Sequence, residues 1–169
     1  MRYLYLLISI FIAPAIHAQS GEPSYKDSAF VEAMLQQHNA FRADLQLPYL
    51  SWSDDLAKDA GAWAAHLAAI DKGDHDQSVR GREGENIWWG TAGAFSFTDM
   101  AGFWAAEKKD FVYGIFPNCR KGKAVVGHYT QMVWKNSVSV GCALASNGQT
   151  DYLVCRYSPA GNIIGQKPY

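Results

Sequence analysis

The sequence lacks a strong excess of charge of either sign, with a formal net charge of −1 over 169 residues. Nucleic acids and anionic membrane surfaces attract proteins that present a positive field. The composition therefore predicts no nucleic-acid partner. Aromatic residues are plentiful, at 14% of the chain, with six Trp and nine Tyr. Such a composition excludes a disordered chain and favours a packed core.

The motifs of several common enzyme classes are also absent. The chain contains no GxSxG, HExxH, CxxC, Walker loop or GxGxxG. These motifs supply the nucleophile of serine hydrolases, the ligands of zinc proteases, redox thiols and the phosphate-binding loops of nucleotide enzymes. The ordinary forms of these enzyme classes therefore have no support in the sequence.

Long hydrophobic runs are missing after the first residues. Arg2 precedes the apolar run Tyr3–Ile12, which at about ten residues is too short to span a membrane, and the small residue Ala18 follows. We predict a signal peptide at residues 1–18 and one mature domain at residues 19–169. The alternative is a buried N-terminal helix. We expect a secreted or periplasmic protein with no membrane span.

Cysteine is scarce, with three residues in the whole chain. An oxidising compartment favours the pairing of two of them. Cys142 and Cys155 flank the turn-type sequence SNGQTD, and a hairpin that places them opposite each other centres its turn between Gly148 and Gln149. We therefore predict a Cys142–Cys155 disulfide. The remaining Cys119 is either a partly buried free thiol or the site of an intermolecular bond.

Three segments show the apolar spacing of amphipathic helices. Their expected N-caps are, in chain order, Asp27 or Ser28, then Ser53, then Ser96 or Thr98. We expect the first helix to stop before Pro48 and the third to reach about Asp110, because proline cannot continue a helix and the pattern fades after residue 110.

The run GHYTQMVW at residues 127–134 mixes polar and apolar side chains. Tyr129, Met132 and Val133 fall on one face at helical spacing, which predicts a short fourth helix. Residues 72–84 are polar and contain glycine, so we expect a loop there. Helices combined with a hairpin predict an α+β layered fold with a small antiparallel sheet.

Four polar residues remain as candidates for chemistry: His75, Glu85, Glu107 and His128. Two His with carboxylates can hold a divalent metal ion or perform acid–base catalysis. Their spacing alone does not separate this interpretation from that of polar residues scattered over a wet surface.

Six segments of the chain resemble the conserved segments of a known protein family, and this resemblance bears on the four candidate residues. They are, in chain order, QHNAFR, GENIWWG, the pair Trp104 and Glu107, GHYTQMVWKNSVSVGCA, YLVCRYSPAGN and GQKPY. Together they resemble the CAP superfamily, which joins cysteine-rich secretory proteins, antigen five proteins and pathogenesis-related proteins. The middle of the chain is most similar to the bacterial branch, whose members carry an SCP domain.

This resemblance implies a three-layer α-β-α sandwich with an open cleft, formed by residues 19–169 as a single CAP domain. It also implies that His75, Glu85, Glu107 and His128 meet in the cleft. The two His, His75 and His128, would then hold zinc or another divalent metal, with no organic cofactor. His75 is matched only by its place shortly before GEN, and the loop that follows it is longer than in plant members. Plant members carry six cysteines, so Cys119 has no counterpart to pair with here.

For the other polar residues in the matched segments we expect mainly structural roles or hydrogen bonds. We expect His38, Asn39 and Arg42 to be structural. Thr130 is expected to form hydrogen bonds around the site. For Gln131, a structural hydrogen bond to the backbone and a functional role remain equally open.

Three functions follow from the resemblance. The first is a non-enzymatic extracellular module that binds a lipid, a sterol or another small ligand. The second is a metal-dependent hydrolase or protease that uses the His/Glu cleft. The third is an extracellular protein-interaction scaffold. We favour the first, because no nucleophile with an adjacent base is visible and because an intact His/Glu set argues against a vestigial cleft.

Overall fold

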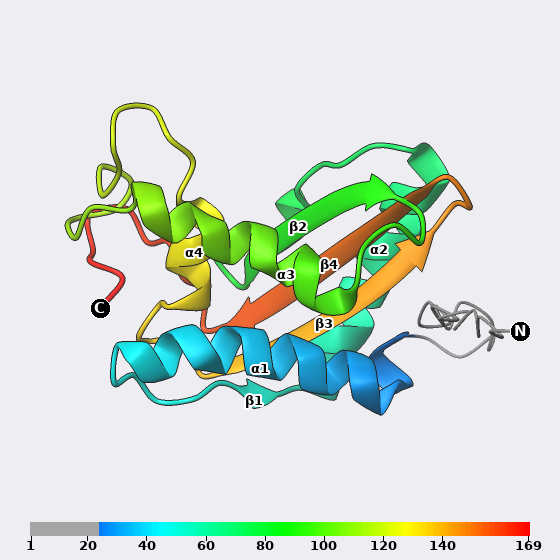
Figure 1. Cartoon of the computed structure of the whole chain (residues 1–169), viewed down its shortest axis with the longest axis horizontal. Helices are drawn as coiled ribbons and strands as arrows, with labels where there is room; N and C mark the ends of the chain where they lie inside the picture. The colour runs from blue at the N-terminus through cyan, green and yellow to red at the C-terminus, as the bar shows by residue number, and fades with distance from the viewer. Residues whose placement is uncertain (1–23) are drawn as a thin grey trace, which may run out of the picture.

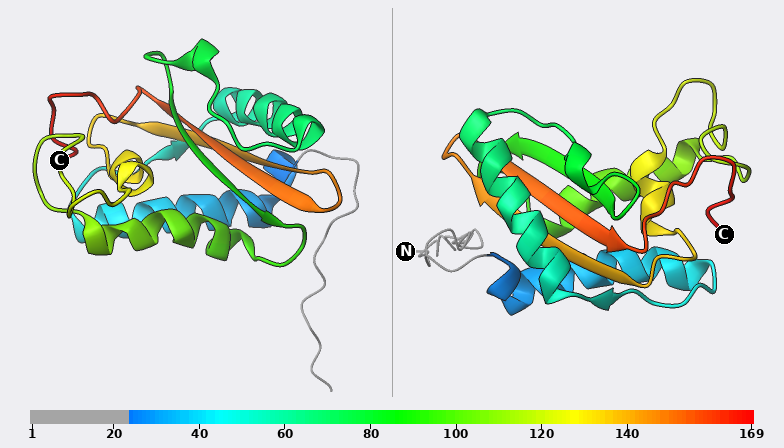
Figure 2. Two further views of the ribbon diagram at one scale, coloured as in Figure 1. Left: turned by 90° about the horizontal axis from the view of Figure 1, so that it is seen from above. Right: turned by 180° about the vertical axis from the view of Figure 1, so that it is seen from behind.

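The computed structural model describes residues 24–169, and the predicted signal peptide lies outside this range. A four-stranded sheet forms the middle layer, with helix α2 (Asp54–Ile70) on one face and the helices α1 (Ser28–Asp44) and α3 (Phe97–Ala105) on the other (Figures 1 and 2). This arrangement confirms the predicted three-layer α-β-α sandwich and its α+β class.

The sheet has the strand order β1-β3-β4-β2. Its strands are β1 (Ser51–Trp52), β2 (Gly84–Thr91), β3 (Ser139–Ser146) and β4 (Thr150–Ser158). Strands β3 and β4 pair antiparallel, as predicted, and β2, which the sequence analysis did not predict as a strand, pairs antiparallel with β4. Strand β1 pairs parallel with β3, so the sheet is mixed. Two residues are too few to show a strand period, which is why β1 left no trace in the sequence pattern.

The hairpin of β3 and β4 has the predicted register. Cys142 lies opposite Cys155 and the two form a disulfide. The Asn147 side chain closes the turn by accepting hydrogen bonds from the backbone N–H groups of Gln149 and Thr150. A polar side chain that caps its own turn is the physical basis of the turn signal. Cys119 is an unpaired, buried thiol, which agrees with the first of its two alternatives.

The predicted caps form at the first three helices. The side chains of Asp27, Ser53 and Ser96 accept hydrogen bonds from N–H groups in the first turns of α1, α2 and α3, respectively. The third helix reaches Asp110, but its last part tightens into a 3₁₀ helix, η3 (Ala106–Asp110), which carries Glu107. The short helix α4 (Gly127–Met132) forms where the sequence predicted it.

Two polar residues of α1 bind neighbouring backbone: the buried Arg42 holds the end of α4, and the half-buried Asn39 holds the segment before β1. The guanidinium of Arg42 donates hydrogen bonds to four backbone carbonyls, those of Pro48, Met132, Trp134 and Ser137. Burial lowers its pKa to about 10. Asn39 exchanges hydrogen bonds with the backbone of Leu50. Both residues are structural, as predicted, and α4 is consequently tied to α1.

Among the helices of residues 24–169, none is both long and apolar enough to cross a membrane.

Candidate functional site

The four candidate residues form two His–Glu pairs. Nδ1 of His75 lies 2.6 Å from Oε1 of Glu85, and Nδ1 of His128 lies 2.7 Å from Oε1 of Glu107. Because a carboxylate only accepts, each Nδ1 carries the proton and donates it. Neither Nε2 atom has a hydrogen-bond partner within residues 24–169. Each ring therefore keeps one nitrogen open.

The pair at α4 is fixed from several sides. Oε2 of Glu107 accepts hydrogen bonds from the backbone N–H groups of His128 and Tyr129, at 2.9 and 3.1 Å. Glu107 thus caps α4, whose own N-cap residue Val126 provides no side-chain cap. The ring of Trp104 lies nearly parallel to that of His128, with centroids 6.2 Å apart. The imidazole is therefore held between a carboxylate and an indole.

The second pair joins a loop to strand β2. Glu85 is almost fully buried at the start of β2, and its Oε1 also accepts from the backbone N–H of Asp76 at 3.1 Å. His75 is more than half exposed on the preceding loop. The hydrogen bond that His75 donates to Glu85 raises the pKa of His75 despite the partial burial of the ring.

A buried arginine of β4, which the sequence analysis did not single out, anchors this loop. Arg156 is 1% exposed, and its Nη2 donates to Asp76 at 2.9 Å. The same nitrogen lies 3.1 Å from Oε2 of Glu85, and Nη1 lies 3.8 Å from Glu83. Burial raises the pKa of Asp76, but hydrogen bonds from Ser78 and Arg156 outweigh it and hold that pKa below its usual range. An arginine inside the apolar run YLVCRY is the signal that could have identified it.

The Arg156 guanidinium faces three carboxylates here, yet its Nε and Nη1 form no hydrogen bond within residues 24–169. Oε2 of Glu85 has no hydrogen bond in the described part of the chain, although Nη2 of Arg156 lies 3.1 Å from it. Oε2 of Glu83 is likewise without one. Negative charge is therefore in excess beneath His75.

Each pair lines a different cavity. His75 and Glu85 border a cavity of about 610 Å³, whereas Glu107 and His128 border a smaller one of about 240 Å³, whose other walls are apolar and aromatic. Between residues 24 and 169, no three His, Cys, Asp or Glu residues cluster as a metal site. The structure thus forms two pairs, and a single ion shared by His75 and His128 stays a prediction.

Gln131 and Thr130 of α4 hold the C-terminal wall of the larger cavity in place through hydrogen bonds. Oε1 of Gln131 accepts from the N–H of Gly161 at 3.0 Å, and its Nε2 donates to Ser137. A Cβ atom at Gly84 or Gly161 would overlap the Gln131 carboxamide, which explains the glycines there. Gln131 thus makes the structural hydrogen bond to the backbone, the first of its two alternatives, and it also lines the larger cavity.

Thr130 donates to Oδ1 of Asn162 at 2.6 Å, and Asn162 donates to the carbonyl of Gly127 at 2.8 Å. These bonds attach the C-terminal segment to α4, so Thr130 forms hydrogen bonds beside the site as expected.

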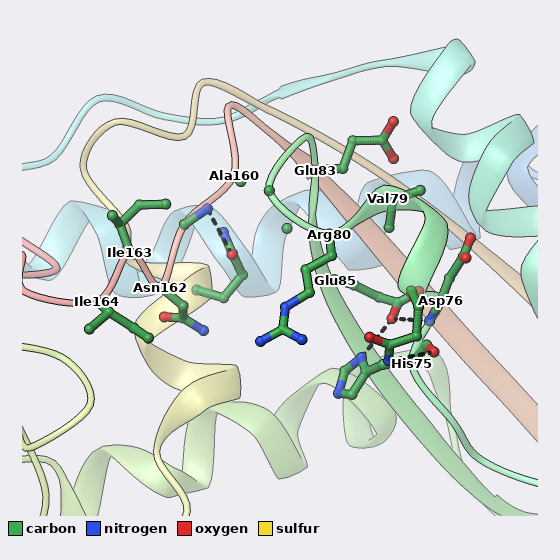
Figure 3. Close-up of a pocket in the computed structure, with 15 residues that line it drawn as sticks. His75, Asp76, Val79, Arg80, Glu83, Glu85, Ala160, Asn162, Ile163 and Ile164 are labelled. Carbon is green, nitrogen blue, oxygen red and sulfur yellow. Dashed lines mark hydrogen bonds and ion pairs between the residues drawn. The ribbon is translucent and has the colours of Figure 1, made fainter.

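The larger cavity has two contrasting walls (Figure 3). One is the charged segment between His75 and Glu85. The other is the C-terminal segment 160–164, which contributes Ile163 and Ile164. In Figure 3 the Arg80 side chain extends from the first wall into the space between them.

Comparison with known proteins places the chain in a family. The family model described as "Cysteine-rich secretory protein family", with the short name CAP, matches residues 35–157. Pathogenesis-related protein 1C of Nicotiana tabacum is 36% identical over 165 residues, which cover 97% of this chain and 90% of the relative. GLIPR1-like protein 1 of Bos taurus is 35% identical over 162 residues, covering 87% and 66%. These relatives are from a plant and an animal, so the narrower resemblance to the bacterial branch stays a prediction.

Solved structures share the fold. The structure of BmVAL-1 superposes with a TM-score of 0.71 at 23% identity, covering 84% of this chain and 82% of that one. The crystal structure of NaASP2 with Zn²⁺ gives a TM-score of 0.65, also at 23% identity, with coverages of 82% and 83%. The family model, the identities and the shared fold agree: the chain belongs to the CAP family, the family of cysteine-rich secretory proteins.

Proposed function

We propose that this protein is an extracellular binding module that holds a divalent metal ion, zinc in the first instance, through Nε2 of His75 and of His128. The observation that carries the proposal is the shared arrangement of the two rings. In each, Nδ1–H donates to a buried or half-buried carboxylate and Nε2 remains open. Metal-bound histidines have this arrangement, because the carboxylate fixes the tautomer and orients the ring.

The donor set fits a borderline-soft divalent ion. Imidazole nitrogen is a preferred ligand of zinc, and the excess negative charge at Glu83 and Glu85 favours a cation nearby. Two neutral ligands hold zinc less firmly than three ligands or thiolates do, so other coordination positions stay open to water or to a ligand. The ion would supply Lewis acidity and a point of attachment at those positions.

Strand β2 contacts the residues that carry both rings. Glu85 binds His75, and the next residue, Asn86, donates from its side chain to the backbone carbonyl of His128 at 3.1 Å. Successive residues of a strand lie about 3.3 Å apart along it. The side chains of Glu85 and Asn86 leave the strand toward opposite faces of the sheet, so β2 contacts the two His from its two sides, and a shared ion requires the exposed ring of His75 to turn toward His128.

Secretion is part of the proposal. The sequence predicts a signal peptide at residues 1–18, and the Cys142–Cys155 disulfide is typical of an oxidising compartment. The family is named for secretory proteins, and the relative from Nicotiana tabacum is named a pathogenesis-related protein. We infer a protein of the extracellular space or the periplasm whose cavities take a lipid, a sterol or another small molecule.

Binding is favoured over catalysis by the surroundings of the two rings. In residues 24–169 no Ser, Thr or Cys side chain is hydrogen-bonded to either imidazole, so no activated nucleophile accompanies them. A metal-dependent hydrolase is the second candidate, since a carboxylate, Glu85, lies directly beside a candidate metal ligand, His75.

Turnover assays separate the two candidates. The zinc-loaded protein is incubated with peptide, ester and polysaccharide substrates, and mass spectrometry identifies the small molecules that co-purify with it. We expect a bound small molecule and no turnover. Turnover that requires zinc and is lost in Glu85→Gln would support the hydrolase instead. A protein that binds neither zinc nor any small molecule would support the third function, an interaction scaffold.

A further inference from the structure

The smaller cavity, of about 240 Å³, has walls that are mainly aromatic. Strand β2 and helix α3 contribute four rings to its lining, those of Trp88, Trp89, Phe103 and Trp104. Trp89 and Phe103 are 54% and 51% exposed, although large rings stabilise a fold most when they are buried. Exposed apolar side chains that gather around a hollow are typical of a binding site. The search for a ligand class therefore starts from these rings.

The exposed rings are held in place by their neighbours. Trp88 and Phe103 lie nearly parallel, with centroids 6.1 Å apart, and the ring of Phe95 meets both of them edge-on. A Cβ atom at Gly73 would overlap the ring of Trp89, so the backbone of the loop after α2 packs directly on that ring. The aromatic walls are thus formed before a ligand arrives, which lowers the entropic cost of binding.

The polar groups of this cavity carry one negative charge and leave few acceptors open. Glu107 is the only carboxylate that lines the cavity in the described part of the chain. It accepts hydrogen bonds from Nδ1 of His128 and from two backbone N–H groups. The indole N–H of Trp104 is donated to the carbonyl of Ile87 at 3.2 Å. Among the lining side chains of residues 24–169, Nε2 of His128 is the only acceptor atom that accepts no hydrogen bond.

We propose that this cavity binds a trimethylammonium group, such as that of choline, against the rings of Trp89 and Phe103 and near the carboxylate of Glu107. A cation is attracted to aromatic faces, and quaternary ammonium groups are recognised in this way. The nitrogen of a trimethylammonium group carries no hydrogen, so the group needs no acceptor. A primary ammonium group has three N–H donors to satisfy and would find one open side-chain acceptor here.

The size and polarity of the cavity agree with this ligand class. Its volume of about 240 Å³ lies below the range of about 300–1,000 Å³ that is usual for drug-sized ligands, which suits a small cationic group. A sugar could also stack on the rings, but its hydroxyl groups would lose hydrogen bonds to water that these walls do not replace.

This inference rests on the proposed function in one respect, that the cavity is a ligand site. It concerns the protein without metal, because zinc on His128 would place a second cation in the same cavity. The test is therefore made on the full mature protein with EDTA present. Choline is titrated into the protein, and NMR follows the indole N–H signal of Trp89 and the methyl signal of choline. The matched ligand is dimethylbutanol, in which carbon replaces the ammonium nitrogen of choline.

Choline is expected to bind wild type about fivefold more tightly than dimethylbutanol does, with its methyl signal moved upfield by the rings. Phe103→Leu and Trp89→Leu keep an apolar side chain but remove a ring. Each is expected to weaken choline binding about threefold and to leave dimethylbutanol binding nearly unchanged. Tyr49→Leu is the control, because Tyr49 is an exposed aromatic residue that does not line the cavity, and it is expected to change neither affinity.

Vesicles of phosphatidylcholine distinguish the two sources of the group. Co-sedimentation of wild type that is lost in Phe103→Leu would assign the site to a lipid headgroup, whereas choline binding without co-sedimentation would assign it to a free solute. Equal affinity of choline for wild type and both ring variants would overturn the proposal. So would dimethylbutanol binding as tight as that of choline, or no binding of choline to wild type. An absence of zinc binding would count against the proposed function alone.

Discussion

The Asn86 side chain donates a hydrogen bond to the backbone carbonyl of His128 across 3.1 Å, which fixes the first turn of α4 to strand β2. The second hydrogen of the same amide is donated to the hydroxyl of Tyr157, also at 3.1 Å. Tyr157 in turn lies 2.7 Å from Nε2 of His38 on α1. A buried chain of polar groups therefore connects α1, the sheet and the helix that carries the candidate metal ligand.

This buried network of hydrogen bonds makes the folding stability of the protein depend on pH. Nδ1 of His38 donates to the carbonyl of Met34, so its Nε2 must be unprotonated to accept from Tyr157. Burial lowers the pKa of His38 from 6.5 to about 4. Above pH 6.5 the ring is neutral in both the folded and the unfolded protein, so keeping it neutral costs no free energy. Between pH 6.5 and 4 only the unfolded protein binds the proton, so the folding stability falls as the pH drops through this range.

We expect His38 to account for a loss of about 2 to 3 kcal/mol between pH 7 and pH 4.5, at about 1.4 kcal/mol for each pKa unit. Urea denaturation at several pH values measures it. The variant His38→Gln is expected to be less stable at pH 7 and to show a shallower decline with acid than wild type. Parallel declines in the two proteins would contradict the buried neutral histidine.

The hairpin gives a second prediction. The Cys142–Cys155 bond closes a loop with a sequence separation of 13, and its reduction is expected to lower the free energy of unfolding by about 3 kcal/mol. Peptide mapping without reductant checks the pairing, and native alkylation checks Cys119, whose buried thiol is expected to react only after unfolding. Recovery of a peptide that joins Cys119 to either partner would show the assignment to be wrong.

The third prediction concerns Arg156. Its replacement by Gln leaves Asp76, Glu83 and Glu85 facing one another without their buried counter-charge. We expect a loss of stability of about 3 to 5 kcal/mol, the usual result when one partner of a buried ion pair is removed. Arg82→Gln, on the exposed side of Glu83, is the control and is expected to change stability by less than about 1 kcal/mol. Similar stabilities of the two variants would mean that Arg156 does not hold the His75 loop.

The fourth prediction concerns removal of the signal peptide. Cleavage after Ala18 is expected to leave Gln19 as the first residue of the protein recovered from a secreting host. Intact-mass measurement decides the point. A chain that retains Met1 and sediments with membranes would contradict the signal peptide.

Local chemistry made the helices and the hairpin predictable. The caps of Ser53 and Ser96 are short-range hydrogen bonds, and the register of Cys142 with Cys155 follows from counting outward from the turn. Strand β1 was not predictable, because two residues adopt it only by lying beside β3. The sheet is consequently mixed where the sequence indicated antiparallel pairing alone.

The site was predictable in part. The resemblance named His75, Glu85, Glu107 and His128, and the structure forms a hydrogen-bonded pair from each His and one Glu. Which Glu would bind which His depends on the path of the long loop before β2, which no periodic pattern describes. The role of Arg156 was missed because it depends on three carboxylates that come together only when that loop folds onto β4.

Calorimetric zinc titration tests the central claim most directly. Wild type, His128→Ala and His75→Ala are compared at pH 7.5 and 5.5, with His66→Ala, an exposed histidine of α2, as control. Protonated imidazole cannot bind zinc, and the Glu85 hydrogen bond raises the pKa of His75 above 6.5, so the loss of affinity is expected to begin above pH 6.5 and to be severe at pH 5.5.

At pH 7.5 we expect one zinc ion per chain in wild type and His66→Ala and none in either site variant, with all four proteins folded, since the core contacts of α4 come from Tyr129 and Met132. Equal zinc affinity in wild type and His128→Ala would contradict the account and remove His128 from any metal site.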